Sequence, residues 1–512
     1  MLALGLVGAS DAYAVTVQQV AKFVGDCTHH CAGPRGVGEG KGGALGAGVA
    51  VSADGRTAMI GAPEANDGDG AVWVFVRNGH SWKQQGAKLV ADCTRDCGGP
   101  RGRGENQKTF QFGQTIALSA NGNTALIGAP GNGERGGAWV FTRSHGRWAQ
   151  QGAEIIAYCH PKTRHCTGPN GTGLGGYAFG GSVALSANGN TGLIGAPGGI
   201  GAAWIFARSH GGWHQHAKLV GNCVPTSAHV CAGPNGTGEN YRGVNTGEFG
   251  SSAALSADGN TALIGAVGDV SADRLVDGAA WVFTRSGSAW SQQGSKLIGD
   301  CTIGCGGPNG TGEADSIGDD GFGESAALSG DGNTALLGAE ADSNFAGAAW
   351  VFTRAAGAWS QQGAKLIGDC TIRCGGPNGT GEINGTDDGG SFGSSVALSG
   401  NGSTALIGAP QDTNCNCDLN FGRGAAWLFT RSAGVWNQQG AKLIGDCTGS
   451  CSGPNGTGEL DGRGQFGAAV ALSGTASAAV IGAPNDNCRG RCDGSLANPG
   501  QGAAWNFTFG GL

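Results

Sequence analysis

The sequence predicts an all-β fold, a seven-bladed β-propeller with four-stranded antiparallel blades. Two observations support this prediction. A unit of 67 to 74 residues, measured between the glycines of its Phe-Gly mark, occurs seven times along the chain. Each unit contains four short apolar segments bounded by turn-forming residues, and none keeps apolar residues at helical spacing over several turns. A long internal period of this kind is typical of propellers and solenoids.

The clearest unit covers residues 392–446. Its expected strands are 394–399, 404–408, 425–430 and 436–444, all rich in Val, Ile, Leu, Phe and Trp. A Gly-Asn-Gly turn joins the first two, and such turns favour tight hairpins. Gly, Asn, Asp and Pro bound the other segments. The seven units begin at these dipeptides: Leu45-Gly46, Phe112-Gly113, Phe179-Gly180, Phe249-Gly250, Phe322-Gly323, Phe392-Gly393 and Phe466-Gly467.

The two ends of the chain favour a closed ring over an open solenoid. The last unit ends shortly after Trp505, so it lacks a fourth strand. A matching strand occurs at the other end, because residues 18–24 (QQVAKFV) correspond to 438–444 (QQGAKLI). We expect the N-terminal strand to complete the last blade, which would remove the open edges that a solenoid must cap.

Residues 1–14 have the features of a secretory signal peptide. They are short and apolar, and they end in Ala12-Tyr13-Ala14, a pattern that precedes signal-peptide cleavage. The basic residues that normally come first are missing, which suggests a truncated start; a buried strand is the alternative. We expect residues 15–512 to form one propeller domain in a secreted or cell-surface protein. No segment reaches the roughly 20 apolar residues of a membrane span.

Cysteine spacing also points to an oxidising compartment. The 18 cysteines form nine close pairs, seven of them at the same place in each unit. An even count at repeated spacing, behind an export signal, predicts disulfides. Zinc is the alternative, but it requires two pairs to converge on one site. The cysteines expected in local disulfides are Cys27, Cys31, Cys93, Cys97, Cys159, Cys166, Cys223, Cys231, Cys301, Cys305, Cys370, Cys374, Cys447, Cys451, Cys488 and Cys492. Cys415 and Cys417 lie too close together for an easy local bridge, so their pairing stays open.

The recurring segment FGxSVALSxxGNTALIGAP…GAAWVFTRS resembles the FG-GAP repeats of bacterial extracellular proteins, which are related to the propeller of integrin α subunits. The likeness covers residues 15–512 and implies a seven-bladed propeller of the kind often used for adhesion or ligand binding. Gly-Ala-Pro stands at 408–410, for example, but becomes Gly-Ala-Val at 265–267 and Gly-Ala-Glu at 338–340. Many members carry an acid-rich calcium loop between the first two strands of a blade. Here that turn holds at most one carboxylate, such as Asp54, so a tight Asx-Gly hairpin is expected instead.

The variable segments lie between the second and third strands and between blades, which places them on one face of a propeller. Function usually resides in such loops. In the interblade loop DCTxxCxGPNGTGE, the first and last acids offer oxygens that could hold a cation such as calcium; a disulfide-pinned turn with solvated acids is the alternative. These candidate metal ligands are Asp300, Glu313, Asp369, Glu382, Asp446 and Glu459. No cofactor motif and no catalytic constellation is recognisable.

We expect a binding, adhesion or structural module rather than an enzyme, with a protein or glycan partner at the loop-rich face. The net charge of −7 and the lack of a basic run disfavour a nucleic-acid partner. The alternative function is a carbohydrate-active hydrolase or lyase that uses carboxylates on that face or in the central channel. Assembly into an oligomer or a surface layer is a third possibility.

Overall fold

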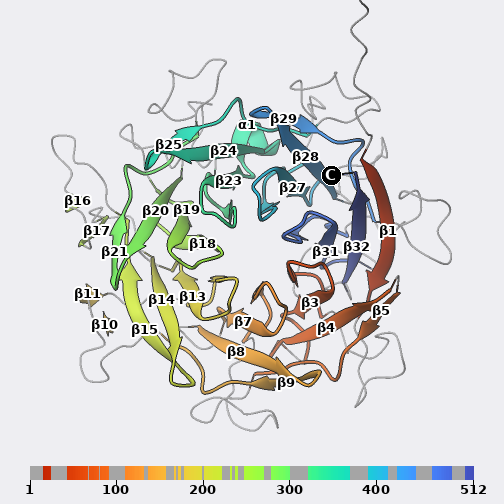
Figure 1. The fold of residues 1–512 in the computed structure, drawn as a ribbon, viewed down its shortest axis with the longest axis horizontal. Coiled ribbons are helices and arrows are strands. Elements are labelled where there is room, and N and C mark those ends of the chain that lie inside the picture. Colours follow the sequence, from red (N-terminus) through yellow and green to blue (C-terminus); the bar gives the residue numbers. More distant parts are fainter. Residues whose placement is uncertain are drawn as a thin grey trace, which may run out of the picture.

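The computed structural model describes residues 15–24, 43–66, 68–79, 81–91, 110–131, 136–156, 166–168, 171–173, 178–198, 201–221, 231–232, 237–239, 247–269, 278–299, 321–368, 390–412, 424–445, 464–486 and 502–511. Seven four-stranded antiparallel sheets surround a central axis (Figure 1). The predicted seven-bladed propeller is therefore confirmed.

The strands of each blade run outwards from the axis in chain order. In blades 1 to 3 they are β2 (Gly48–Val51), β3 (Thr57–Ala62), β4 (Ala71–Asn78), β5 (Ser81–Gln84); β6 (Thr115–Leu118), β7 (Thr124–Ala129), β8 (Gly137–Ser144), β9 (Arg147–Gln150); and β12 (Ser182–Leu185), β13 (Thr191–Ala196), β14 (Ala202–Ser209), β15 (Gly212–Leu219). In blades 4 to 6 they are β18 (Phe249–Leu255), β19 (Thr261–Ala266), β20 (Ala279–Ser286), β21 (Ala289–Gln292); β22 (Ser325–Leu328), β23 (Thr334–Ala339), β24 (Ala348–Ala355), β25 (Ala358–Gln361); and β26 (Ser395–Leu398), β27 (Thr404–Ala409), β28 (Ala425–Ser432), β29 (Val435–Gln438).

Blade 7 combines the two ends of the chain. Its strands are β30 (Ala469–Leu472), β31 (Ala478–Ala483), β32 (Ala503–Gly510) and, outermost, β1 (Thr16–Phe23). β1 pairs antiparallel with β32, from Thr16 opposite Gly510 to Phe23 opposite Ala504. In Figure 1 the red β1 accordingly lies against the blue β32.

The fourth strand of blade 6 is shorter than the sequence predicts. β29 ends at Gln438, because Gly440 adopts a positive φ of 69° and interrupts the ladder. Pairing resumes in an isolated bridge between Ala426 and Leu443. Blade 3 lacks the corresponding glycine, and its fourth strand β15 continues without a break to Leu219.

A few described elements were not expected from the sequence. A single helical turn, α1 (Asp342–Phe345), follows β23 in blade 5. Two small hairpins lie in interblade segments: β10 (Cys166–Gly168) with β11 (Gly171–Gly173), and β16 (Cys231–Ala232) with β17 (Thr237–Glu239). Their short polar sequences carry no apolar alternation that would have indicated strands.

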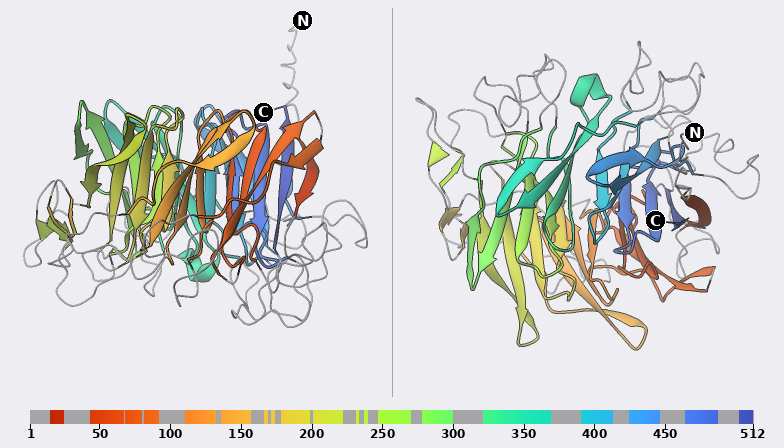
Figure 2. Two further views of the ribbon diagram at one scale, coloured as in Figure 1. Left: turned by 90° about the horizontal axis from the view of Figure 1, so that it is seen from below. Right: turned by 45° about the horizontal axis from the view of Figure 1, so that its top comes forward.

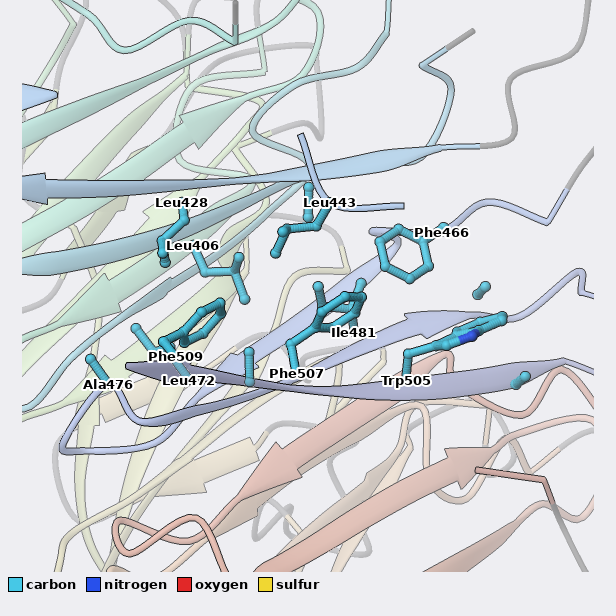
Figure 3. Packing of buried hydrophobic residues seen from close by; sticks show 14 residues of the cluster. Leu406, Leu428, Leu443, Phe466, Leu472, Ala476, Ile481, Trp505, Phe507 and Phe509 are labelled. Carbon is cyan, nitrogen blue, oxygen red and sulfur yellow. The ribbon is translucent and has the colours of Figure 1, made fainter. Parts of the chain in front are cut away.

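The hydrophobic core lies between neighbouring blades. In each blade the tryptophan of the third strand is almost completely buried. In blades 2 to 7 the phenylalanine ring of the Phe-Gly mark packs edge-on against it, as Phe466 does on Trp505 with ring centroids 5.4 Å apart (Figure 3). The glycines of the repeat allow blades to approach closely. A Cβ at Gly61 would lie only 1.9 Å from the carbonyl oxygen of Gly113 in the next blade. The two recurrent marks are thus parts of the blade interface.

The turn between the first two strands is the predicted Asx-Gly hairpin. In blade 4, Ser256 Oγ donates to Asp258 Oδ1 at 2.5 Å, and the backbone N–H of Asn260 donates to the same oxygen at 2.9 Å. Burial raises the pKa of Asp258, but the hydrogen bonds from Ser256 and Asn260 outweigh that effect and lower it. Gly259 adopts the required positive φ of 72°. This carboxylate therefore stabilises its own turn.

Candidate functional site

The two faces of the propeller differ in their connections. Five residues separate the first and second strands in every blade, and two separate the third and fourth strands in blades 1 to 6. We call this side the hairpin face. Between the second and third strands the connection ranges from 5 residues in blade 3 to 19 in blade 7. The second strands end and the third strands begin on the opposite side, which we call the loop-rich face and where α1 also lies (Figure 2).

Several carboxylates of the loop-rich face anchor the base of a variable loop. Asp412 follows β27, is 2% exposed and accepts a hydrogen bond of 2.7 Å from Lys442 of the same blade. Lys442 Nζ also lies 5.7 Å from the ring centroid of Trp427. The equivalent ion pairs are Asp269 with Lys296, Asp342 with Lys365, and Asp486 with Lys22. These aspartates are structural, because a buried carboxylate without its cation would be costly.

We expect the substitution Asp412→Ala to lower the free energy of unfolding by about 2 to 3 kcal/mol, since it leaves the Lys442 ammonium half-buried without its anion. Asp412→Asn should lose less than half of that. Blade 1 already contains a lysine paired with an asparagine: Lys88 donates to the amide oxygen of Asn66 at 2.7 Å. Urea denaturation of both variants measures the difference. Equal stability of Asp412→Ala and the unchanged protein would contradict a structural role for the pair.

A second group of carboxylates lies at the ends of the innermost strands. We define the inner rim as four positions in each blade: the two residues that flank the Phe-Gly mark and the two residues that follow the Gly-Ala mark. In blade 5 these are Gly321 and Glu324, and Glu340 and Ala341. In no blade do these positions hold Lys, Arg or His. The carboxylates of the inner rim are Glu64, Glu248, Glu324 and Glu340. The described inner rim therefore carries acidic side chains and no basic ones.

Blade 5 contributes two of these carboxylates from adjacent strand ends. Glu324 immediately precedes β22 and Glu340 immediately follows β23. Both strands are paired, with Ser325 opposite Gly338, so the two glutamates leave the sheet at the same end. In blade 3 the same two positions are occupied by a glycine and a proline, and a Cβ on that glycine would lie 3.0 Å from the proline Cδ. Glu324 and Glu340 are thus close neighbours.

The surroundings of Glu324 favour its neutral form. Burial raises the pKa of Glu324 to about 8, and repulsion from Glu340 and Glu248 adds to the increase. Burial also raises the pKa of Glu340. At pH 7 Glu324 therefore holds a proton and can donate a hydrogen bond, while Glu248 and Glu340 provide acceptors beside it.

Two serines of blade 6 border these glutamates. A Cβ at Gly338, two residues before Glu340, would lie 2.0 Å from the carbonyl oxygen of Gly393, which directly precedes Ser394. The hydroxyl oxygens of Ser391 and Ser394 are buried and find no hydrogen-bond partner within the described ranges. We call the following residues the rim cluster: Glu248, Glu324, Glu340, Ser391 and Ser394.

The rim cluster combines a proton donor, carboxylate acceptors and free hydroxyls, which suits a ligand rich in hydroxyl groups. Polar groups that are buried without partners favour binding of a ligand that satisfies them. Across the part of the chain that the structure describes, no group of three His, Cys, Asp or Glu is arranged to hold a metal ion.

The site residues predicted from the sequence lie almost entirely outside the described residues. This holds for all six candidate metal ligands in the interblade loops, namely Asp300, Glu313, Asp369, Glu382, Asp446 and Glu459. It also holds for the cysteines, except that Cys166 and Cys231 begin the short strands β10 and β16, where only the backbone is described. The disulfides and the calcium alternative stay predictions.

The sequence shows that Glu340 departs from the repeat, but it does not show which residues lie beside it. Glu340 replaces the proline of the Gly-Ala-Pro mark, and that departure is visible in the sequence. Glu324 replaces a residue that is uncharged in the other blades, which is a second visible signal. Only the pairing of β22 with β23 brings the two positions together.

None of the described helices is long and apolar enough to cross a membrane. No protein family matches the chain, and no curated protein matches it by sequence. Among solved structures the chain is similar to a Bacteroides uniformis protein designated as a candidate 6-phosphogluconolactonase. The identity is 13%, the TM-score is 0.43, and the match covers 78% of this chain and 85% of the other. A likeness this distant carries no argument about activity; the seven-bladed fold follows from the strand pairing itself.

Proposed function

We propose that this protein is a secreted or cell-surface binding module whose protein or glycan ligand meets the loop-rich face. One observation carries the proposal. Connections on the hairpin face have constant length, whereas those on the loop-rich face range from 5 to 19 residues between the second and third strands. Variable loops on a rigid scaffold commonly form binding surfaces. The resemblance to FG-GAP repeats agrees with this function.

The rim cluster narrows the proposal to a position on that face. At this place blades 4 and 5 carry carboxylates where most other blades have uncharged residues. The donors and acceptors of the cluster suit the hydroxyl groups of a glycan or the polar side chains of a protein. A ligand centred on the inner rim would contact the rim cluster and reach the surrounding loops at the same time.

The test is a glycan and surface-protein array probed with the protein and with a variant carrying Glu324→Ser and Glu340→Pro. Both substitutions copy residues from other blades, since Ser394 and Pro410 occupy the equivalent positions in blade 6. We expect the fold to persist and binding to fall at least 10-fold, because the donor and an acceptor are lost. Ser291→Ala, an exposed position of β21 near the hairpin face that is alanine in blade 2, is the matched control and should bind normally. An unchanged binding profile for the double variant would refute binding at the rim cluster.

A hydrolase or lyase acting on carbohydrates is the second candidate, and the neutral Glu324 beside Glu340 favours it. A glycosidase needs one protonated carboxyl to donate a proton to the leaving oxygen and a second carboxylate as base or nucleophile. In this function Glu324 would be the acid and Glu340 the second group. A panel of polysaccharide substrates decides between the two functions. If the protein cleaves a polysaccharide, loses that activity in Glu324→Gln and does not bind the same glycan stably, it is an enzyme and not a binding module.

A further inference from the structure

Charge is distributed unevenly around the hairpin face. In blades 1 to 3, the described residues of the hairpin turns and of the strand ends that adjoin them include six basic side chains and one acidic side chain, Asp54, a net charge of +5. Lys218 is not counted, because it lies at the opposite end of β15. The corresponding segments of blades 4 to 6 carry three arginines and two aspartates. We call the six basic residues the basic strip: Arg56, Arg77, Lys83, Arg143, Arg147 and Arg208. The whole chain, by contrast, has a net charge of −7.

The members of the strip are connected across three blades by hydrogen bonds. In blade 1 the backbone N–H of Arg77 donates to the carbonyl of Arg56 at 2.8 Å. Arg143 of blade 2 donates to blade 1, to Thr57 Oγ1 and Gln85 Oε1 at 3.2 Å each. Arg208 of blade 3 donates in the same way to blade 2. Residues scattered over about 150 positions of the sequence thus form one continuous surface.

The guanidinium groups of Arg143 and Arg208 are hydrogen-bonded to neutral oxygens, so these bonds do not neutralise their charge. Arg143 Nε donates to Asn123 Oδ1 at 2.8 Å, and Arg208 uses the equivalent asparagine of its own blade. Burial lowers the pKa of Arg143, and the Asp54 carboxylate partly opposes that shift. In blades 4 and 5 the corresponding arginines face aspartates in their own turns. A positive surface therefore remains over blades 1 to 3 alone.

The same surface offers little for apolar or base-stacking contacts. Trp148 and Trp213 are half-buried, and the guanidinium carbons of Arg143 and Arg208 lie 5.4 and 5.8 Å from their ring centroids. The large apolar side chains that are exposed in the described part of the chain lie elsewhere. Single-stranded nucleic acids are usually held by exposed aromatic platforms, and membranes by exposed apolar groups. A hydrated polyanion bound through its charge fits the strip best.

We propose that the hairpin face of blades 1 to 3 binds an acidic polysaccharide through its sulfate or carboxylate groups. The strip lies on the opposite face from the rim cluster, so this inference is independent of the proposed function. Exposed Arg56, Lys83 and Arg147 contact the polyanion directly. Arg143 and Arg208, fixed by their hydrogen bonds, add a rigid positive field beneath it.

The test measures binding to immobilised heparin, a sulfated probe, and to polygalacturonate, a carboxylated probe, between 50 and 300 mM salt. The variant carries Arg56→Asn, Lys83→Ser and Arg147→Ala, each a residue found at the equivalent position of another blade. We expect its affinity at 100 mM salt to fall 10- to 100-fold. The slope of log affinity against log salt should decrease by about 2 to 3, because three cations no longer displace counterions.

A matched control distinguishes the effect of losing the basic strip from the effect of a changed net charge. Ala289→Asp, Ser291→Asp and Ala358→Asp change the net charge by the same amount at equivalent positions of blades 4 and 5. This variant should bind within 2-fold of the unchanged protein. Equal losses in both variants would overturn the proposal, and so would no retention on either polysaccharide at 50 mM salt. Tighter binding of a DNA duplex than of heparin at equal salt would overturn the choice of partner.

Discussion

Deletion of residues 15–24 is expected to lower the melting temperature by more than 10 °C. The deletion removes β1, whose residues pair with β32 along nearly its whole length. It also removes Phe23, which is 2% exposed and stacks on Phe75 of blade 1 with centroids 4.6 Å apart. Loss of a buried phenylalanine alone typically costs about 3 to 5 kcal/mol. Because β1 joins blade 7 to blade 1, its removal also opens a strand edge that favours aggregation.

A permuted chain provides the control for this deletion. It begins at residue 43 and carries residues 15–24 directly after Gly511, so that β1 follows β32 through a short hairpin as the fourth strand does in the other blades. Thermal melting followed by circular dichroism compares the three proteins. The permuted chain should melt within a few degrees of the original. A deletion variant that melts like the full chain would contradict a structural role for β1.

The fold could be predicted because the same physical requirement is repeated seven times. Tight blade contacts demand glycine at positions such as Gly61, and a buried third strand demands apolar residues around Trp73. Each requirement leaves the same mark in every unit, and repetition separates those marks from chance. The end of β29 was missed because a single glycine with positive φ, Gly440, decides it.

Neither the rim cluster nor the basic strip could be recognised in the sequence in the same way. Glu324 and Glu340 become neighbours only through a strand pair, and burial determines the pKa of Glu324. The sequence contains no basic run, yet the propeller brings Arg56 and Arg143 to one surface although 87 positions separate them. Functional residues of a repeat protein occur once, so no internal repetition reveals them.

Substitution of Glu324 by glutamine is expected to stabilise the protein at pH 8.5 and to leave its stability unchanged at pH 5. The pKa of Glu324 is raised from 4.5 in the unfolded chain to about 8 in the folded protein, chiefly by burial. Between these values the folded protein binds the proton and the unfolded chain does not, so stability falls as pH rises. Glutamine keeps the shape of the protonated side chain but has no proton to lose.

The expected gain at pH 8.5 is roughly 2 to 3 kcal/mol, because solvent screening of a partly exposed group reduces an upper limit of roughly 5 kcal/mol. Urea denaturation of both proteins at half-unit pH intervals from 5 to 9 measures it. Glu64→Gln is the matched control: burial alone raises the pKa of Glu64, with no neighbouring carboxylate adding to the shift, so its effect should be smaller. Parallel stability curves for Glu324→Gln and the unchanged protein would mean that Glu324 ionises normally. The rim cluster would then lose its proton donor, and the enzyme alternative would lose its acid, whereas binding through the variable loops would not be affected.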